Sequence, residues 1–199
     1  MRKAFQAATA AEARVCSSGI DIRTLEVVRD SPFLPAPNEM RLVLLEDGDT
    51  PPGDDLVTAA FALAFDGDSL LMTKLRDARR GWDIPGGRLE PGETAERAMR
   101  REVYEETAAR LGPARLFAYQ RIRLGAPKPD ADAYPYPDSY MVFFRAPVFA
   151  LESFVANDEA EERGLLPPSA VPGTIWGRKN RALYDAALAA PGRSPAPTG

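Results

Sequence analysis

The 199-residue chain contains no histidine, and this absence excludes several kinds of active site. A Ser-His-Asp or Cys-His relay needs an imidazole to move protons, and a histidine-ligated zinc site needs one to hold the metal. The single cysteine, Cys16, excludes an intrachain disulfide and a cysteine-rich metal site. Its small polar surroundings are more typical of an incidental thiol than of a nucleophile. Any metal must therefore be held by oxygen ligands, which magnesium and manganese prefer.

Long apolar runs are missing as well. No segment approaches the ~20 apolar residues that a membrane-spanning helix needs. Polar residues interrupt the N-terminal segment before it can form a signal peptide. The formal net charge of −4 argues against nucleic acid as the main partner. We therefore expect a cytoplasmic protein that binds neither membranes nor nucleic acid.

The remaining composition, 45% hydrophobic and 27% charged residues, is ordinary for a globular protein with one substantial core. We divide the chain into an N-terminal extension (1–50), a main domain (51–190) and a proline-rich tail (191–199) that we expect to be disordered. The extension holds two expected strands, 20–27 and 40–44, which either complete a sheet or form a dimer contact. The sequence does not decide between these arrangements, so it leaves open whether the protein forms a homodimer.

Apolar patterning predicts the elements of the main domain. Strands are expected at 56–65, 69–75, 116–124 and 140–149, with a short strand and glycine turn at 82–87. Residues 164–168 are expected to form a turn. Helices are expected from residue 95 as far as 111, before Gly112 and Pro113, and at 174–190. Strands alternating with two helices predict an α/β fold, with a mixed sheet packed between helices.

The first of these helices has an unusual distribution of acids. Thr94 can cap it, and at 3.6 residues per turn Glu102 and Glu106 share an arc with apolar residues such as Met99. Glu105 lies at the border of that arc. Three carboxylates at this spacing repel one another, and partial burial raises the cost of ionising them. A divalent cation among them would relieve both costs.

The alternative is a solvated acidic helix that is paired with arginine at a spacing of four residues. Most charge runs are of this kind, but it does not explain acids on the apolar arc of the helix. The arginines available for such pairs are Arg97, Arg100, Arg101 and Arg110.

The strand, glycine turn and acidic helix together resemble the Nudix box, Gly-x5-Glu-x7-Arg-Glu-U-x-Glu-Glu-x-Gly-U, where U is a bulky aliphatic residue. Two positions depart from this pattern, since Ala108 replaces its last glycine and Ala109 its last aliphatic residue. The matching positions are Gly87, Glu93, Arg101, Glu102, Val103, Glu105 and Glu106.

The resemblance implies an α/β/α sandwich and a metal-dependent hydrolase that cleaves the diphosphate linkage of a nucleoside diphosphate derivative. It implies Mg²⁺ or Mn²⁺ held by the carboxylates of Glu102, Glu105 and Glu106 and by the backbone carbonyl of Gly86. Glu102 would activate water and Arg101 would orient its carboxylate, so that Arg101, Glu102 and Glu105 form the catalytic group. Some relatives take a further acid from another loop, for which the candidates here are Glu159, Glu161 and Glu162.

Residues outside the helix are candidates for binding a small-molecule nucleotide. Lys74 and Arg76 can face a phosphate, although a solvated edge explains each equally well. The stretch 134–141 resembles the Trp-Pro-Phe-Pro-x-Ser segment of NADH diphosphatases, and Tyr134 and Tyr136 can stack on a base. The alternative, which we favour, is an ordinary proline-rich loop. A non-catalytic nucleotide sensor and an NADH-diphosphatase-like activity remain alternatives to the general hydrolase.

Overall fold

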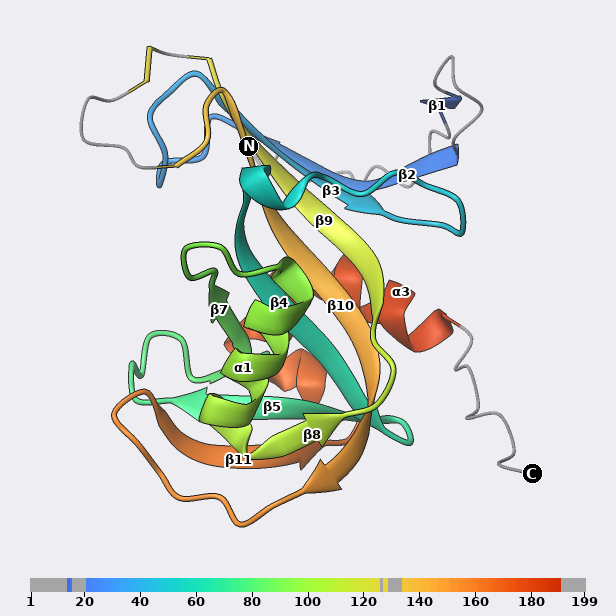
Figure 1. Ribbon diagram of the computed structural model, residues 1–199, viewed down its shortest axis with the longest axis vertical. Coiled ribbons are helices and arrows are strands. Elements are labelled where there is room, and N and C mark those ends of the chain that lie inside the picture. Colours follow the sequence, from blue (N-terminus) through green and yellow to red (C-terminus); the bar gives the residue numbers. More distant parts are fainter. Residues whose placement is uncertain (1–13, 16–20, 126, 129–133, 191–199) are drawn as a thin grey trace, which may run out of the picture.

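The fold is taken from a computed structural model that describes residues 14–15, 21–125, 127–128 and 134–190 (Figure 1). Cys16 and the expected disordered tail, 191–199, lie outside these residues. The strands are β1 (Arg14–Val15), β2 (Asp21–Arg29), β3 (Asn38–Leu44), β4 (Val57–Asp66), β5 (Ser69–Leu75), β6 (Trp82–Asp83), β7 (Gly86–Arg88), β8 (Ala109–Leu111), β9 (Arg115–Leu124), β10 (Asp138–Leu151) and β11 (Ala160–Leu166). The helices are α1 (Ala95–Thr107), α2 (Ile175–Lys179) and α3 (Arg181–Ala189), with short 3-10 turns at Asp54–Leu56 and Val171–Gly173.

Within the described residues, the strands form a single mixed sheet in the order β1-β2-β3-β9-β10-β4-β5-β11. Strands β6, β7 and β8 pair with β5, β4 and β10 respectively. The sheet is mixed because β10 runs parallel to β4 and antiparallel to β9. The strands of the N-terminal extension belong to this sheet, since β3 pairs along its length with β9.

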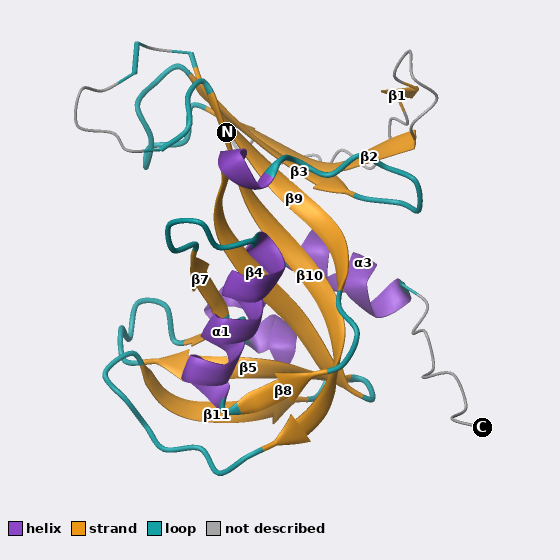
Figure 2. Ribbon diagram, in the orientation of Figure 1, coloured by secondary structure: helices purple, strands orange, loops and turns teal. Residues whose placement is uncertain are grey.

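Helix α1 packs on one face of the sheet, and α2 and α3 pack on the other (Figure 2). The alternation of side chains along β4 separates the two cores. On one face of β4 the side chains of Ala60, Ala62 and Ala64 are small. They leave room for Met99 and Val103 of α1. Leu63 and Phe65 face the opposite core, which the two C-terminal helices cover. The predicted α/β/α sandwich with a mixed sheet is therefore confirmed. No helix in the described part of the chain is long and apolar enough to cross a membrane.

The predicted end of the first helix was wrong. The helix stops at Thr107 rather than at residue 111, because Ala108 adopts the left-handed conformation with φ of 50°. The chain then leaves the helix axis as β8, in which Ala109 pairs with Leu151 of β10. Ala108 is the position where the Nudix box has glycine, and only glycine adopts this conformation without strain.

We therefore expect Ala108→Gly to stabilise the protein by about 0.5–1 kcal/mol, because relief of left-handed strain exceeds the added entropy of the unfolded chain. Urea denaturation of the metal-free protein measures the effect. The matched control is Ala109→Gly, in the buried strand one position further on, which should lose stability. An Ala108→Gly protein no more stable than the original would show that any strain at Ala108 does not exceed the added entropy of the unfolded chain.

Two other sequence predictions were wrong. Residues 164–166 belong to strand β11 instead of a turn, and Gly164 is required for packing, since a β-carbon there would lie 2.8 Å from the ring of Trp82. The expected helix 174–190 is divided at Asn180, where both the backbone N–H and the side-chain amide donate to the carbonyl of Trp176. These contacts end α2 before α3 begins.

Candidate active site

The N-terminus of α1 is fixed by two side-chain oxygens. The hydroxyl of Thr94 accepts a hydrogen bond from the backbone N–H of Arg97 at 3.4 Å, which confirms the predicted cap. A carboxylate oxygen of Asp54 accepts from the backbone N–H of Ala95 at 3.3 Å. The start of the acidic helix is thereby tied to the turn that precedes β4.

The C-terminus of α1 is held by contacts from distant parts of the chain. The last four carbonyls of a helix have no partner within it and need donors from elsewhere. Here each carbonyl has one, so the turn that carries the acids is anchored to β5, to β11 and to the segment before β11. The pairs are Tyr104 O with Ala108 N, Glu105 O with Asn157 Nδ2, Glu106 O with Thr73 Oγ1, and Thr107 O with Arg163 Nη1.

Three carboxylates converge beside this helix. Glu102, Glu106 and Glu159 each present an oxygen, and these oxygens all lie within 4.8 Å of one another. Glu106 is buried on the inner face of α1, as the helical spacing predicts, and Glu102 is half-buried. Glu159 comes from the segment that leads into β11. This arrangement provides three hard oxygen ligands without histidine or cysteine, a donor set that suits Mg²⁺ or Mn²⁺.

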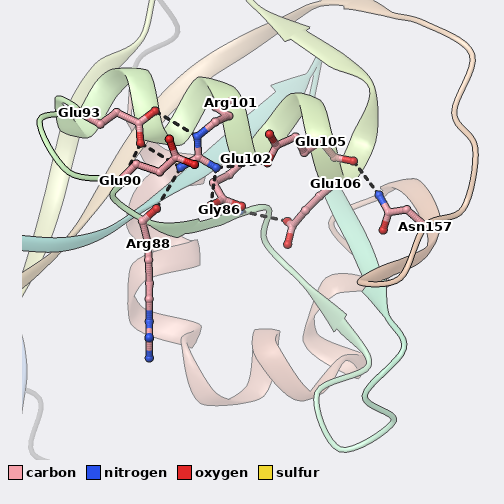
Figure 3. A network of polar contacts seen from close by, with 9 residues as sticks. All are labelled: Gly86, Arg88, Glu90, Glu93, Arg101, Glu102, Glu105, Glu106 and Asn157. Carbon is pink, nitrogen blue, oxygen red and sulfur yellow. Dashed lines mark hydrogen bonds and ion pairs between the residues drawn. The ribbon is translucent and has the colours of Figure 1, made fainter.

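The electrostatics of Glu106 favour a cation at this place. Its carboxylate accepts a hydrogen bond from the backbone N–H of Gly86 at 3.1 Å (Figure 3). Burial raises the pKa of Glu106 to about 8, the Gly86 N–H opposes the rise, and the charges of Glu102 and Glu159 add to it. Burial also raises the pKa of Glu102, against the guanidinium of Arg101. A divalent cation would supply positive charge beside Glu106, whereas Glu102 already pairs with Arg101 at 2.9 Å.

Arg101 connects α1 to strand β7 and to the turn between β7 and α1 (Figure 3). Its guanidinium donates to both oxygens of Glu93 at 3.1 and 2.9 Å, and to the carbonyl of Arg88 at 3.1 Å. It also donates to Glu102 at 2.9 Å and to Glu105 at 3.2 Å. The side chain of Glu105 is 56% exposed and lies with Arg101, outside the group of three carboxylates.

The paired glycines of β7, Gly86 and Gly87, allow this strand to lie close to the carboxylates of α1. A β-carbon on Gly87 would lie 2.5 Å from the carboxylate of Glu102, so any larger side chain would displace that group. Gly86 has φ of 146°, and a β-carbon there would lie 2.5 Å from the carbonyl oxygen of Ala60. The backbone therefore requires glycine at position 86, and the observed place of the Glu102 carboxylate requires glycine at position 87.

The basic candidates for phosphate binding lie at the end of β5. Lys74 forms ion pairs with Glu161 at 3.4 Å and with Glu162 at 3.7 Å. Arg76 donates from Nε to the backbone carbonyl of Asn157 at 2.6 Å. Two of the three loop acids therefore pair with Lys74, and Glu159 is the one near the α1 carboxylates.

The aromatic candidates lie in the segment before β10. The guanidinium of Arg88, in β7, lies 5.5 Å from the centroid of the Tyr134 ring. Tyr134 and Tyr136 are 38% and 41% exposed. This segment thus contacts β7, the strand that contains Gly86 and Gly87.

Sequence reasoning missed Asn157. Its side chain contacts both α1 and the backbone of Glu159. The signal in the sequence is weak: asparagine often bonds to backbone N–H groups two residues further on in turns, and Asn157 lies two residues before Glu159. Nothing in that pattern indicates the bond to α1.

Comparisons with known proteins bear on the family and the fold of the chain. The family model for the NUDIX domain matches residues 55–186. A putative 8-oxo-dGTP diphosphatase of Bacillus subtilis is 45% identical over 53 residues, which cover 26% of this chain and 35% of that protein. An 8-oxo-dGDP phosphatase of Homo sapiens is 37% identical over 65 residues, which cover 33% of this chain and 20% of that protein. The matched segments thus span only 35% and 20% of the length of these two relatives.

Solved structures show the same fold. The crystal structure of a pyrophosphohydrolase from Bacillus subtilis superposes with a TM-score of 0.57 at 23% identity, covering 82% of this chain and 93% of that one. A MutT protein from Bacillus halodurans superposes with a TM-score of 0.50 at 17% identity, covering 66% and 82%. At these identities the likeness concerns the fold alone.

Proposed function

Because the chain belongs to the Nudix family, as the match over residues 55–186 shows, we propose that it is a metal-dependent hydrolase that cleaves the diphosphate linkage of a nucleoside diphosphate derivative. The observation that carries the proposal is the group of three carboxylate oxygens within 4.8 Å of one another. Glu106 in this group is buried and, among the described residues, has only the Gly86 N–H as a hydrogen-bond donor, so holding its charge without a cation is costly. The proposal includes the cytoplasmic location expected from the sequence.

Mg²⁺ or Mn²⁺ would be held by Glu102, Glu106 and Glu159, with the backbone carbonyl of Gly86 as the further ligand that the Nudix resemblance implies. Glu105 would join this set only if its side chain left Arg101. When bound, the metal would supply positive charge to a diphosphate and make a water molecule more acidic. This chemistry suits substrates that bring several negative charges of their own.

Glu102 is our candidate for the general base. Burial raises its pKa toward the range in which a carboxylate accepts a proton efficiently at neutral pH. Arg101 holds one of its oxygens at 2.9 Å, and the backbone of Gly87 packs directly against the carboxyl group. These contacts fix the direction from which Glu102 can take a proton from water.

The nucleoside side of the substrate would lie near Tyr134 and Tyr136. The contact between Tyr134 and Arg88 brings the aromatic segment to β7, the strand that contains Gly86 and Gly87. An aromatic ring beside β7 can stack on a base while the acids act on the diphosphate. Lys74 and Arg76 would add positive charge on the β5 side.

The names of the relatives suggest which nucleotides to try first. The matched segments of the two 8-oxoguanine nucleotide phosphatases cover 26% and 33% of this chain, so they favour these substrates without identifying them. A substrate panel should therefore contain 8-oxo-dGTP and 8-oxo-dGDP beside the unmodified triphosphates, NADH, nucleotide sugars and dinucleoside polyphosphates.

The proposal is tested by incubating the purified chain with this panel in Mg²⁺, in Mn²⁺ and in EDTA, and by identifying the products. We expect hydrolysis at a diphosphate linkage with either metal and none in EDTA. Turnover in EDTA would contradict the metal assignment. Metal-dependent nucleotide binding without any product would instead favour the non-catalytic sensor.

A further inference from the structure

Glu159 is the least restrained member of the carboxylate group. Glu102 and Glu106 project from a helix whose two ends are tied down, whereas Glu159 lies outside any helix, in the segment between β10 and β11. Its side chain is exposed, so the repulsion of two nearby carboxylates favours a conformation turned toward solvent. Within the described part of the chain, no lysine or arginine forms an ion pair with Glu159. Its place beside α1 must therefore be set by its backbone.

The backbone of Glu159 is held by two neighbours. The side-chain oxygen of Asn157 accepts from the N–H of Glu159 at 2.9 Å and from the N–H of Ala160 at 2.8 Å. The carbonyl of Glu159 accepts from the backbone N–H of Arg76 at 3.0 Å. The turn before β11 is thus closed around the Asn157 side chain.

The same side chain also reaches the acidic helix. The Nδ2 group of Asn157 donates to the carbonyl of Glu105 at 2.9 Å, across 52 positions of sequence (Figure 3). That carbonyl lies between the two α1 residues of the carboxylate group, Glu102 and Glu106. One amide therefore joins the helix that carries two of the acids to the backbone of the third.

We propose that Asn157 is a positioning residue that places Glu159 in the metal-binding group. Its side-chain amide joins the backbone N–H of Glu159 to the carbonyl of Glu105 on α1. Both halves of the amide are needed for this role, the oxygen for the turn and the nitrogen for the helix. The inference rests on the proposed function, since it assumes that the carboxylate group binds Mg²⁺ or Mn²⁺.

A double-mutant cycle on Mn²⁺ affinity tests the inference without using activity. The affinity is measured by calorimetry on the original chain, Asn157→Ala, Glu159→Gln and the double variant. We expect Asn157→Ala to weaken Mn²⁺ binding by about 10- to 100-fold, the usual effect of removing a group that orients a ligand. The double variant should bind no more weakly than Glu159→Gln alone, because Asn157 acts through Glu159.

The control is Tyr104→Phe, which removes the 2.8 Å hydrogen bond from Tyr104 to Glu152 near the other end of the same segment. We expect this variant to bind Mn²⁺ as the original chain does, which separates positioning of Glu159 from general loosening of the segment. If Asn157→Ala does not fold, Asn157→Ser takes its place, because a hydroxyl can still accept from the N–H of Glu159.

Unchanged Mn²⁺ affinity in Asn157→Ala would overturn the inference, as would losses that multiply in the double variant. An equal loss in Tyr104→Phe would also overturn it, since the effect would then belong to the whole segment. If the original chain itself binds no Mn²⁺, the proposed function fails as well. These outcomes distinguish failure of the inference alone from failure of the proposed function.

Discussion

Glu102→Gln is expected to lower kcat by about 10²–10⁴, the usual cost of losing a general base. Glutamine keeps the size of the side chain and can still accept the hydrogen bond from Arg101, but it cannot take a proton from water. The half-buried carboxylate packs against the backbone of Gly87, so we expect no change of fold. The measurement is kcat for the best substrate of the panel at saturating Mg²⁺.

The matched control is Glu96→Gln on the same helix. Glu96 pairs with Arg100 at 2.8 Å on the solvent side of α1, so this variant removes one negative charge from α1 outside the carboxylate group. Its kcat should equal that of the original chain. Near-native turnover in Glu102→Gln would show that another residue is the general base, and Glu159 would be the next to test.

Glu106→Gln is expected to stabilise the metal-free protein at pH 8 and to abolish stabilisation by Mn²⁺. Glu106 titrates near pH 8 when folded and near 4.5 when unfolded, because burial opposes its charge. Between these pH values the folded protein holds a proton that the unfolded chain has lost, so stability falls as pH rises. At about 1.4 kcal/mol per pKa unit, the loss amounts to at most about 5 kcal/mol.

Urea denaturation at pH 5 to 8.5, with and without Mn²⁺, measures both effects. The metal-free original chain should lose stability across this range, and Glu106→Gln should lose much less, since glutamine does not titrate. Glu96→Gln should follow the original chain. A Glu106→Gln protein that is less stable than the original at pH 8 without metal would show that the carboxylate is well accommodated without a cation.

Local patterns were sufficient to predict several of the strands and the buried face of helix α1. Strand β5 was predicted with its observed bounds because its apolar run ends in charged residues on both sides. Helical spacing alone placed Glu106 on the buried side of α1 and Glu105 at the border of that side. Such predictions succeed where the neighbours that decide the structure are close in sequence.

The end of α1 could not be predicted in this way. It depends on Ala108, on the pairing of β8 with β10, and on donors such as Arg163, which lies 56 positions from its acceptor.

Local patterns also could not decide which of the acids Glu159, Glu161 and Glu162 lies near the carboxylates of α1. A bulge between Ala160 and Glu162 breaks the alternation of β11, so strand periodicity gave no means of choosing Glu159 over its neighbours.

The most direct test of a metal site at these carboxylates is a crystal structure with Mn²⁺, located by its anomalous scattering. We predict a peak among Glu102, Glu106 and Glu159, about 2 Å from a carboxylate oxygen of each. A Mn²⁺ ion bound only by other residues, or none at this place in crystals of protein that hydrolyses its substrate with Mn²⁺, would contradict the account.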